Sequence, residues 1–370
     1  MTLLAPALGV VLLLAVLQDI FATVLFPASG RGLIRKPLER AGWAMFRGMG
    51  RWVGARRRRN LVTYGGPTLI VLTLVAWFGL LIAGWSMIYA PAVGDEIVAA
   101  SGPTDTSWTT AVYYSGFALT TLGTGDVVAT SGGYRLLTVA EAAVGFTTFS
   151  MVVTYFLSVY SNLPSRNAFA QGLHRRTRGT DDAAVLLASL ADGDALPATD
   201  FLSSAAASLR QIYQSHRSYP VLRYFHYREP EYALPRMLLT ALDTAALIRA
   251  VLDPQHHARL LRSTALDEFE HAAESLLDEL VPPGDRTGRR DAGDAVHWRE
   301  RARVAGERLA DAGLHLRPDP RAAADRYADL RAGWDPRLRA LAAAVLYDWD
   351  DADGTTRTDR RRVARWRPRP

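Results

Sequence analysis

Three apolar segments, each long enough to cross a lipid bilayer, constrain the fold of this 370-residue chain more than any other feature. They run from Leu3 to Phe26, from Pro67 to Ala90 and from Tyr134 to Tyr160. About 24 residues of helix span roughly 36 Å, and the hydrocarbon core of a bilayer is only about 30 Å thick. The first segment lacks the basic start of a signal peptide and exceeds its usual apolar length of about 7–15 residues, so we expect a retained helix.

The arginines predict how these helices are oriented. Residues 31–59 between the first two apolar segments are rich in arginine and contain one acid, Glu39, whereas residues 91–134 contain four acids and no basic residue. Short loops rich in Lys and Arg remain in the cytoplasm. We therefore expect a multi-pass protein of the plasma membrane, with the N-terminus and residues 91–134 outside and everything after residue 162 in the cytoplasm.

The outside segment contains the stretch TSWTTAVYYSGFALTTLGTGD, which ends at Asp126. Asp105 or Thr106 can cap a helix start, and Ser107–Leu119 then supply about three apolar and aromatic turns. Such a helix is too short to cross the bilayer, but a re-entrant helix that returns as an extended chain over Thr120–Gly125 fits its length. Taken alone, the Gly-x-Gly-Asp motif fits a solvent-exposed turn between two membrane helices equally well.

Residues 64–162 together resemble the pore region of potassium channels, closest to the bacterial two-helix type, here with an extra N-terminal helix. The family pattern T-x-G-[Y/F/L]-G-D corresponds to Thr121, Leu122, Gly123, Thr124, Gly125 and Asp126. The resemblance implies an outer helix, a pore helix, a selectivity filter and an inner helix. It also implies a homotetramer that holds K⁺ on the backbone carbonyls of Thr121, Leu122, Gly123 and Thr124.

The chemistry of such a filter explains the spacing of the glycines. A dehydrated cation needs oxygen ligands on all sides, which rings of backbone carbonyls supply. Carbonyls that all point one way require backbone dihedrals alternating between ordinary and left-handed regions, and glycine adopts the latter without a steric penalty. One chain supplies one strand of the filter, so four copies around an axis are needed to close the ring.

The motif departs from the family at Thr124, where an aromatic residue is expected. In the family that ring packs against aromatic residues of the pore helix, whose positions Tyr113 and Tyr114 occupy here. Thr124 cannot reach them in the same way, which leaves open a weakly selective cation channel, or a non-conducting membrane-anchored sensor or scaffold. Phe117 stands where some relatives have a glutamate behind the filter.

Two further features belong to the predicted inner helix. Glu141 either braces the pore helix from behind or reaches water at the outer end of its span. Gly145, Phe149, Val153 and Leu157 recur every fourth residue, so this stripe either lines the cavity below the filter or packs against other helices. Gly145 matches the hinge glycine of the family, although it can instead permit close helix packing.

The basic linker does not have the form of a voltage sensor, because its arginines lie outside any spanning helix. Leu33–Val53 mix apolar and basic residues, which suits an amphipathic helix on anionic lipid as well as a simple topogenic cluster. In the first span, Gln18 and Asp19 are expected to face protein.

The C-terminal half is predicted to be helical throughout, although its fold cannot be named from the sequence. The expected helices are Asp181–Ala191, Asp200–His216, Pro235–Leu252, Thr264–Leu280, Val296–Ala312, Pro320–Ala332 and Pro336–Asp348. The ending RRRVARWRPRP resembles a basic tail without nucleic-acid specificity. The chain has no cysteine and shows no nucleophile–base pair, so we expect neither an enzyme nor a cofactor beyond K⁺ in the pore.

The predicted fold is therefore an all-α membrane protein with three transmembrane helices, a re-entrant pore helix with its filter, and a helical cytoplasmic domain. The expected domains are the N-terminal helix (1–27), the basic linker (28–64), the pore domain (65–163) and the cytoplasmic domain (164–370). The expected function is a tetrameric potassium channel that is gated through the cytoplasmic domain by an unknown stimulus.

Overall fold

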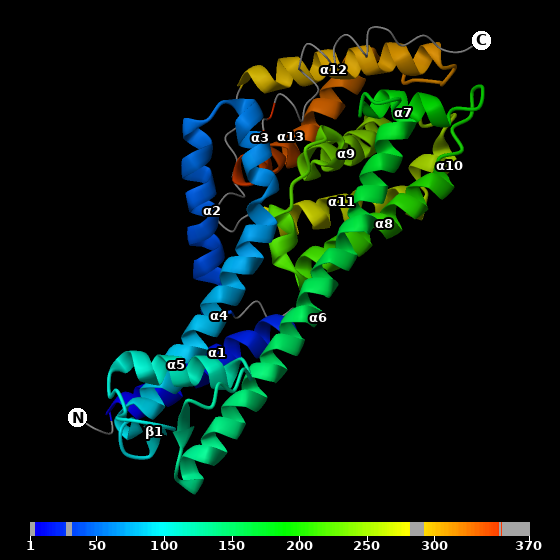
Figure 1. The fold of residues 1–370 in the computed structure, drawn as a ribbon. Coiled ribbons are helices and arrows are strands. Elements are labelled where there is room, and N and C mark those ends of the chain that lie inside the picture. Colours follow the sequence, from blue (N-terminus) through cyan, green and yellow to red (C-terminus); the bar gives the residue numbers. More distant parts are fainter. Residues whose placement is uncertain (1–3, 27–31, 282–291, 348, 350–370) are drawn as a thin grey trace. The chain divides into compact units, whose positions relative to one another are not determined.

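The computed structural model describes residues 4–26, 32–281, 292–347 and 349, and over these residues the chain is almost entirely helical (Figure 1). The predicted basic tail lies outside the described residues. The chain forms two compact units. The first unit comprises Met1–Phe46 and Pro67–Ser161, and the second comprises Arg47–Gly66 and Asn162–Pro370.

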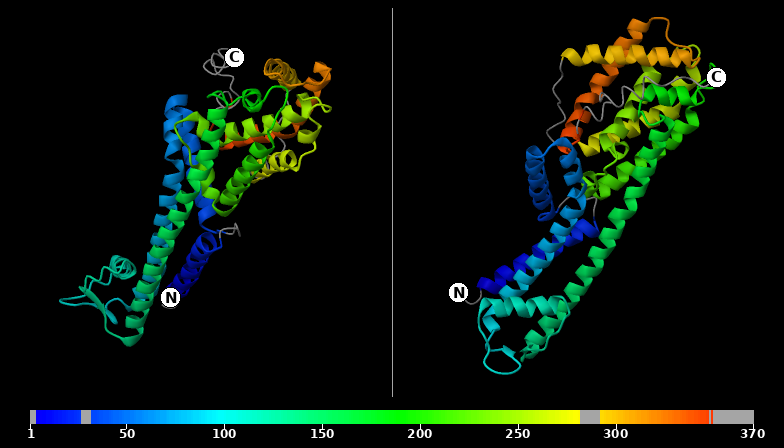
Figure 2. Two further views of the ribbon diagram at one scale, coloured as in Figure 1. Left: turned by 90° about the vertical axis from the view of Figure 1, so that its right-hand side faces the viewer. Right: turned by 45° about the horizontal axis from the view of Figure 1, so that its top comes forward.

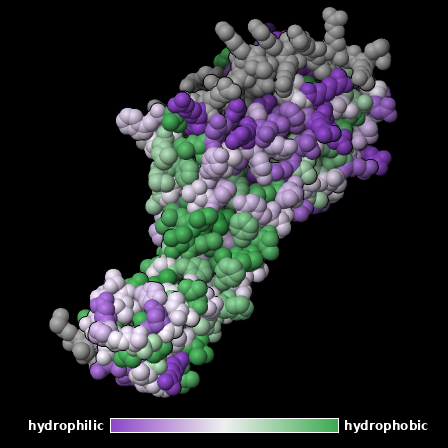
Figure 3. Space-filling model, viewed as in Figure 1, coloured by the Kyte–Doolittle hydropathy of each residue, from purple (hydrophilic) through white to green (hydrophobic). Residues whose placement is uncertain are grey.

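The first unit contains the membrane helices. Its elements are α1 (Leu4–Val24), the first part of α2 (Arg35–Trp52), α4 (Gly65–Tyr89) from Pro67 on, the 3-10 turn η2 (Ala90–Ala92), β1 (Ile97–Ala99), α5 (Trp108–Leu119), β2 (Val127–Ala129) and α6 (Gly132–Arg176) as far as Ser161. Helices α1, α4 and α6 are long and apolar enough to cross a membrane, and hydrophobic side chains cover much of their visible surface (Figure 3). The expected all-α membrane protein with three such helices is confirmed.

Helices α1 and α4 pack closely because glycines face each other at their contact. A Cβ atom on Gly9 would lie 2.5 Å from the carbonyl oxygen of Gly84, and one on Gly84 would lie 2.8 Å from the Leu13 side chain. Small residues allow membrane helices to approach each other in this way, and close packing drives their association in lipid. The extra N-terminal helix is therefore packed on the predicted outer helix.

Helix α6 is longer than predicted. The helix that contains the predicted apolar segment Tyr134–Tyr160 continues through Pro164 to Arg176 as one helix, as Figure 2 shows. Proline removes one backbone hydrogen bond and costs about 3 kcal/mol inside a helix. The turns around Pro164 bury Leu163, Arg166 and Ala170, and this packing offsets the lost bond.

The second unit is a bundle of helices around a leucine- and alanine-rich core. Its elements are α3 (Ala55–Thr63), α7 (Ala183–Leu190), α8 (Thr199–Ser218), η3 (Pro220–Tyr224), η4 (Pro230–Tyr232), α9 (Leu234–Val251), α10 (Ala258–Leu261), α11 (Thr264–Leu280), α12 (Ala292–Asp311) and α13 (Pro320–Ala344). Helix α9 lies at the centre, since nearly all its residues are buried. Helix α3 within the basic linker was not predicted.

The predicted break at Pro336 is absent, because α13 is a single helix. Its buried arginine, Arg331, donates to Asp335 at 2.9 Å and to Asp243 of α9 at 3.2 Å. The Tyr327 hydroxyl also donates to Asp243, at 2.7 Å. Breaking such a buried network would leave charges unpaired, which typically costs about 3–5 kcal/mol. On the other side of Pro336, the Arg339 guanidinium donates to the same Asp335 carboxylate at 2.5 Å, so the network joins both sides of the proline in one helix.

Candidate functional site

The predicted pore helix is present as α5. It begins at Trp108, with Ser107 at the N-cap position, so Asp105 and Thr106 do not occupy the cap as expected. The Asp105 carboxylate instead accepts hydrogen bonds from the Ser107 backbone N–H at 3.0 Å and from the Thr110 hydroxyl at 3.0 Å. Through these bonds Asp105, which precedes α5, fixes the first turn of the helix.

The backbone after α5 alternates as the filter chemistry requires. Thr121, Gly123 and Gly125 have φ angles of 57°, 60° and 75°, while Leu122 and Thr124 between them do not have positive φ. A Cβ atom on either glycine would meet nothing within 4 Å, so the conformation, and not a lack of space, demands glycine. Thr121 is not a glycine, and a left-handed L-residue costs roughly 1–2 kcal/mol. Such strain is typical of functional sites.

The whole stretch from Thr120 to Asp126 is exposed on the single chain. Leu122, an apolar residue, has 71% of its surface accessible.

Asp126 fixes the outer end of this stretch. Its carboxylate accepts hydrogen bonds from the Thr124 hydroxyl at 2.5 Å and from the Tyr113 hydroxyl of α5 at 3.0 Å. The Thr124 hydroxyl, and less strongly that of Tyr113, hold the pKa of Asp126 below its usual value. Thr124 thus connects to an aromatic residue of α5 through Asp126, a route that no local sequence pattern predicts.

A small two-stranded sheet, whose strands flank α5 in the sequence, anchors the same end and was also not predicted. Strands β1 and β2 pair antiparallel, with Ala99 opposite Val127. The Asp126 carbonyl accepts a hydrogen bond from the Ala100 backbone N–H at 2.7 Å. The segment before α5 is thereby hydrogen-bonded to the segment after it, and this pairing fixes the backbone at the outer end of the predicted filter.

Behind the predicted filter, two hydrogen bonds join α6 to α5. Glu141 is fully buried and accepts a bond from the Ser115 hydroxyl at 2.6 Å. The hydroxyls of Tyr114 and Thr138 lie 2.6 Å apart. The Tyr114 and Phe117 rings meet edge to face, with their centroids 5.1 Å apart. Of the two interpretations of Glu141, this geometry favours a brace on the pore helix.

Gly145 lies against the end of the pore helix. A Cβ atom there would be 1.9 Å from the carbonyl oxygen of Leu119. Gly145 is buried, whereas Phe149, Val153 and Leu157 are exposed on the single chain. Each step of four residues turns about 40° around the helix, so the stripe rotates gradually along α6. Gly145 permits the close packing of α6 against the end of α5.

Asp19 in α1 has partners that the sequence did not identify. Its buried carboxylate accepts bonds from the Trp77 indole at 2.8 Å and from the backbone N–H groups of Ile34 at 2.8 Å and Arg35 at 3.3 Å. It therefore caps α2 from a different helix, where the positive end of the helix dipole favours an acid. Gln18, also expected to face protein, is exposed on the single chain.

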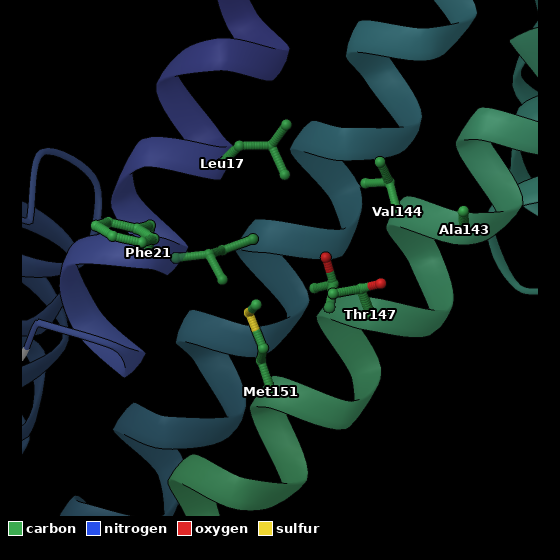
Figure 4. A pocket seen from close by; sticks show the side chains of 8 residues that line it. Leu17, Phe21, Ala143, Val144, Thr147 and Met151 are labelled. Carbon is green, nitrogen blue, oxygen red and sulfur yellow. The ribbon is translucent and has the colours of Figure 1, made fainter.

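An apolar cavity of about 330 Å³ lies between α1 and α6. Figure 4 shows Leu17 and Phe21 of α1 on one side, and Val144, Thr147 and Met151 of α6 on the other. The cavity thus lies beside the stretch of α6 that contains Gly145. The extra helix α1 forms part of the surroundings of the predicted inner helix.

These features define the class of the protein. It is an all-α membrane protein in which a short helix and a glycine-alternating loop lie between two membrane-capable helices.

Comparison with known proteins agrees with this class. Residues 70–162 match the family model described as "Ion channel", and the resemblance to the pore-domain family is confirmed over that segment. The chain is also 30% identical over 223 residues to the uncharacterized membrane protein YdjJ of Bacillus subtilis (strain 168). The match covers 59% of this chain and 62% of that relative, so it spans less than two thirds of the relative's length. No solved structure matches the chain.

Proposed function

We propose that four copies of this protein form a potassium-selective channel in the plasma membrane, through which ions pass passively. The observation that carries the proposal is the left-handed backbone at Thr121, Gly123 and Gly125. Alternation at every second residue turns successive carbonyl oxygens toward the same side of the chain. Four such strands supply the oxygen cage that replaces the water around a cation.

In this arrangement K⁺ lies on the carbonyls of Thr121, Leu122, Gly123 and Thr124. The exposure of this stretch on the single chain supports a homotetramer, because one strand leaves the cation open on its other sides. The last carbonyls of α5 carry a partial negative charge, which favours a cation near the end of this helix.

Two braces support potassium selectivity in spite of Thr124. At the outer end, the Thr124–Asp126–Tyr113 hydrogen bonds take the place of the aromatic ring of the family. Behind the pore helix, Glu141 accepts from Ser115 and ties α5 to α6. Both contacts restrain the filter backbone and thereby the size and the field strength of its cage of carbonyl oxygens, the two properties invoked to explain preference for K⁺ over Na⁺.

The distribution of charge supports an N-terminus outside the cell and a C-terminal domain in the cytoplasm. Along the basic linker, Trp43 and Phe46 are buried, while Met45, Met49 and Trp52 are exposed. A helix with basic residues and exposed apolar side chains suits contact with anionic lipid of the inner leaflet. The cytoplasmic domain gates the pore, and no enzymatic activity is part of the proposal.

Recording from purified protein in planar bilayers, under opposed K⁺ and Na⁺ gradients, tests this function. We expect unitary currents that reverse near the potassium equilibrium potential. Gly123→Ala forces a side chain into a left-handed position and should abolish these currents. Gly116→Ala is the matched control, because Gly116 lies within α5 and a Cβ atom there meets nothing within 4 Å.

Two outcomes would contradict the proposal in different ways. A reversal potential near zero would indicate a weakly selective cation channel. Complete absence of unitary current from folded, oligomeric protein would favour a membrane-anchored sensor or scaffold.

A further inference from the structure

Arg166 is a buried arginine on the part of α6 that belongs to the second unit. Only 2% of its surface is accessible. Its two terminal nitrogens donate to the backbone carbonyls of Leu222 at 3.2 Å and Phe225 at 3.0 Å, and its guanidinium lies 5.4 Å from the centre of the Tyr227 ring. Burying a guanidinium is costly unless it is well bonded, so these contacts fix its position.

The carbonyls that Arg166 binds belong to the segment Leu222–Tyr227, which we call the linking segment. Its Phe225 packs directly on Gly66, at the start of α4. A Cβ atom on Gly66 would lie 2.5 Å from the Phe225 ring. The linking segment therefore contacts α6 through the backbone of Phe225 and α4 through its side chain.

A third hydrogen bond ties the same stretch of α6 to the helical domain. The Ser215 hydroxyl, near the end of α8, donates to the Asn162 side chain at 2.6 Å. Asn162 and Arg166 are four residues apart in one helix, so they lie on neighbouring turns of the same face.

Both helices that meet the linking segment continue into the first unit without a break. Helix α6 runs from Gly132 to Arg176, and α4 from Gly65 to Tyr89. These helices correspond to the inner and outer helices of the proposed pore. A displacement of the linking segment acts on both, because a packed helix moves as a stiff element and does not deform continuously.

We propose that Arg166 couples the cytoplasmic domain to the gate, by holding the linking segment between the inner and outer helices. Arg166 is a positioning residue, since it does not touch the conduction path. The inference rests on the proposed function and adds to it the route by which the helical domain acts on the pore. A signal sensed by this domain shifts the linking segment and thereby biases two arrangements of α6.

Two substitutions act on the coupling from opposite sides. Arg166→Lys keeps the charge but loses the fork geometry that reaches two carbonyls at once. Gly66→Ala pushes on the Phe225 ring from α4. Arg175→Lys is the matched control on α6, since Arg175 is exposed, and Gly79→Ala is the control on α4, where a Cβ atom meets nothing within 4 Å.

Full-length protein in planar bilayers gives the readout. We expect each of the two variants to change the open probability by about fivefold or more, the usual lower range of allosteric coupling. Unitary conductance and reversal potential should stay at wild-type values, which a general distortion of the pore would not allow. The double variant should differ from the product of the two single effects, because both act through one segment. The controls should match wild type.

Hydrogen exchange on the same preparations supplies a second readout that needs no current. Arg166→Lys should speed exchange in residues 219–227 and also in α6 around residues 162–170. Wild-type open probability in a folded Arg166→Lys variant would overturn the proposal, as would faster exchange confined to the linking segment. If Arg166→Lys does not fold, Gly66→Ala decides on the same criteria. If wild-type protein passes no current, the proposed function fails. The exchange pattern alone then tests whether the linking segment and α6 are coupled through Arg166.

Discussion

The contact between Gly145 and the end of the pore helix gives the sharpest test of how α6 supports the filter. In Gly145→Ala the new methyl carbon would lie 1.9 Å from the Leu119 carbonyl oxygen and 2.8 Å from its carbonyl carbon. Carbon–oxygen contacts normally begin at about 3.3 Å, so the two helices must separate by more than about 1 Å. Both partners are backbone, and neither can rotate aside.

The magnitude follows from two opposing terms. Replacing glycine by alanine inside a helix stabilises it by about 1 kcal/mol. Overpacking costs about 1–3 kcal/mol, and the rigid backbone contact places this site at the upper end. We therefore expect Gly145→Ala to lower the free energy of unfolding by about 2 kcal/mol per chain. Leu119 lies two residues before Thr121, so we expect the displacement also to reach the inner end of the proposed filter.

Thermal unfolding of the purified protein measures the first effect, and bilayer recording measures the second. Gly172→Ala is the control, because Gly172 lies in the same helix with nothing within 4 Å of its Cβ position. At roughly 2–4 °C per kcal/mol, Gly145→Ala should lower the melting temperature by about 4–8 °C, while Gly172→Ala leaves it unchanged or raises it. Equal stability and equal unitary current in the two variants would refute this account of the contact.

Further predictions concern separate parts of the molecule. Asp19→Asn leaves one of the three donors to this side chain without a strong acceptor, so the free energy of unfolding should fall by about 1–3 kcal/mol. Ser115→Ala removes the donor to Glu141 and should alter inactivation; unchanged inactivation in both Ser115→Ala and Glu141→Gln would exclude the brace. Thr124→Val should lower the K⁺/Na⁺ permeability ratio in bi-ionic recordings, whereas Thr124→Ser should preserve it. Burial lowers the pKa of His226 to about 4, below its unfolded value near 6.5, although its two neighbouring carbonyls favour the charged ring. The stability from the neutral ring is therefore complete above pH 6.5 and falls by about 3 kcal/mol toward pH 4, a slope that urea titrations should detect and His226→Phe should remove.

The membrane helices and the pore helix were predictable because their signals are local. Long apolar runs and a short aromatic helix before alternating glycines appear directly in the chain. The four-residue spacing of Arg331, Asp335 and Arg339 is also a local signal, and it favours a continuous helix through Pro336. The contacts of Arg331 with Asp243 could not be foreseen, since they depend on how α9 and α13 pack.

Other parts of the site depend on residues far apart in the chain. The Asp19 carboxylate meets the Trp77 indole 58 residues further on, and no local pattern marks that pair. Strands β1 and β2 have three residues each, too few for an alternating pattern to emerge. Arg166 resembled any other arginine after a membrane span, because its two acceptors are backbone carbonyls and carry no sequence signal.

The most direct measurement is an experimental structure of the purified oligomer with thallium in place of potassium, since Tl⁺ gives an anomalous signal. The account predicts a fourfold assembly with Tl⁺ peaks on the axis, between rings of carbonyl oxygens from Thr121 to Thr124. Residues 121–125 that point away from any symmetry axis, or a protein that stays monomeric, would contradict it.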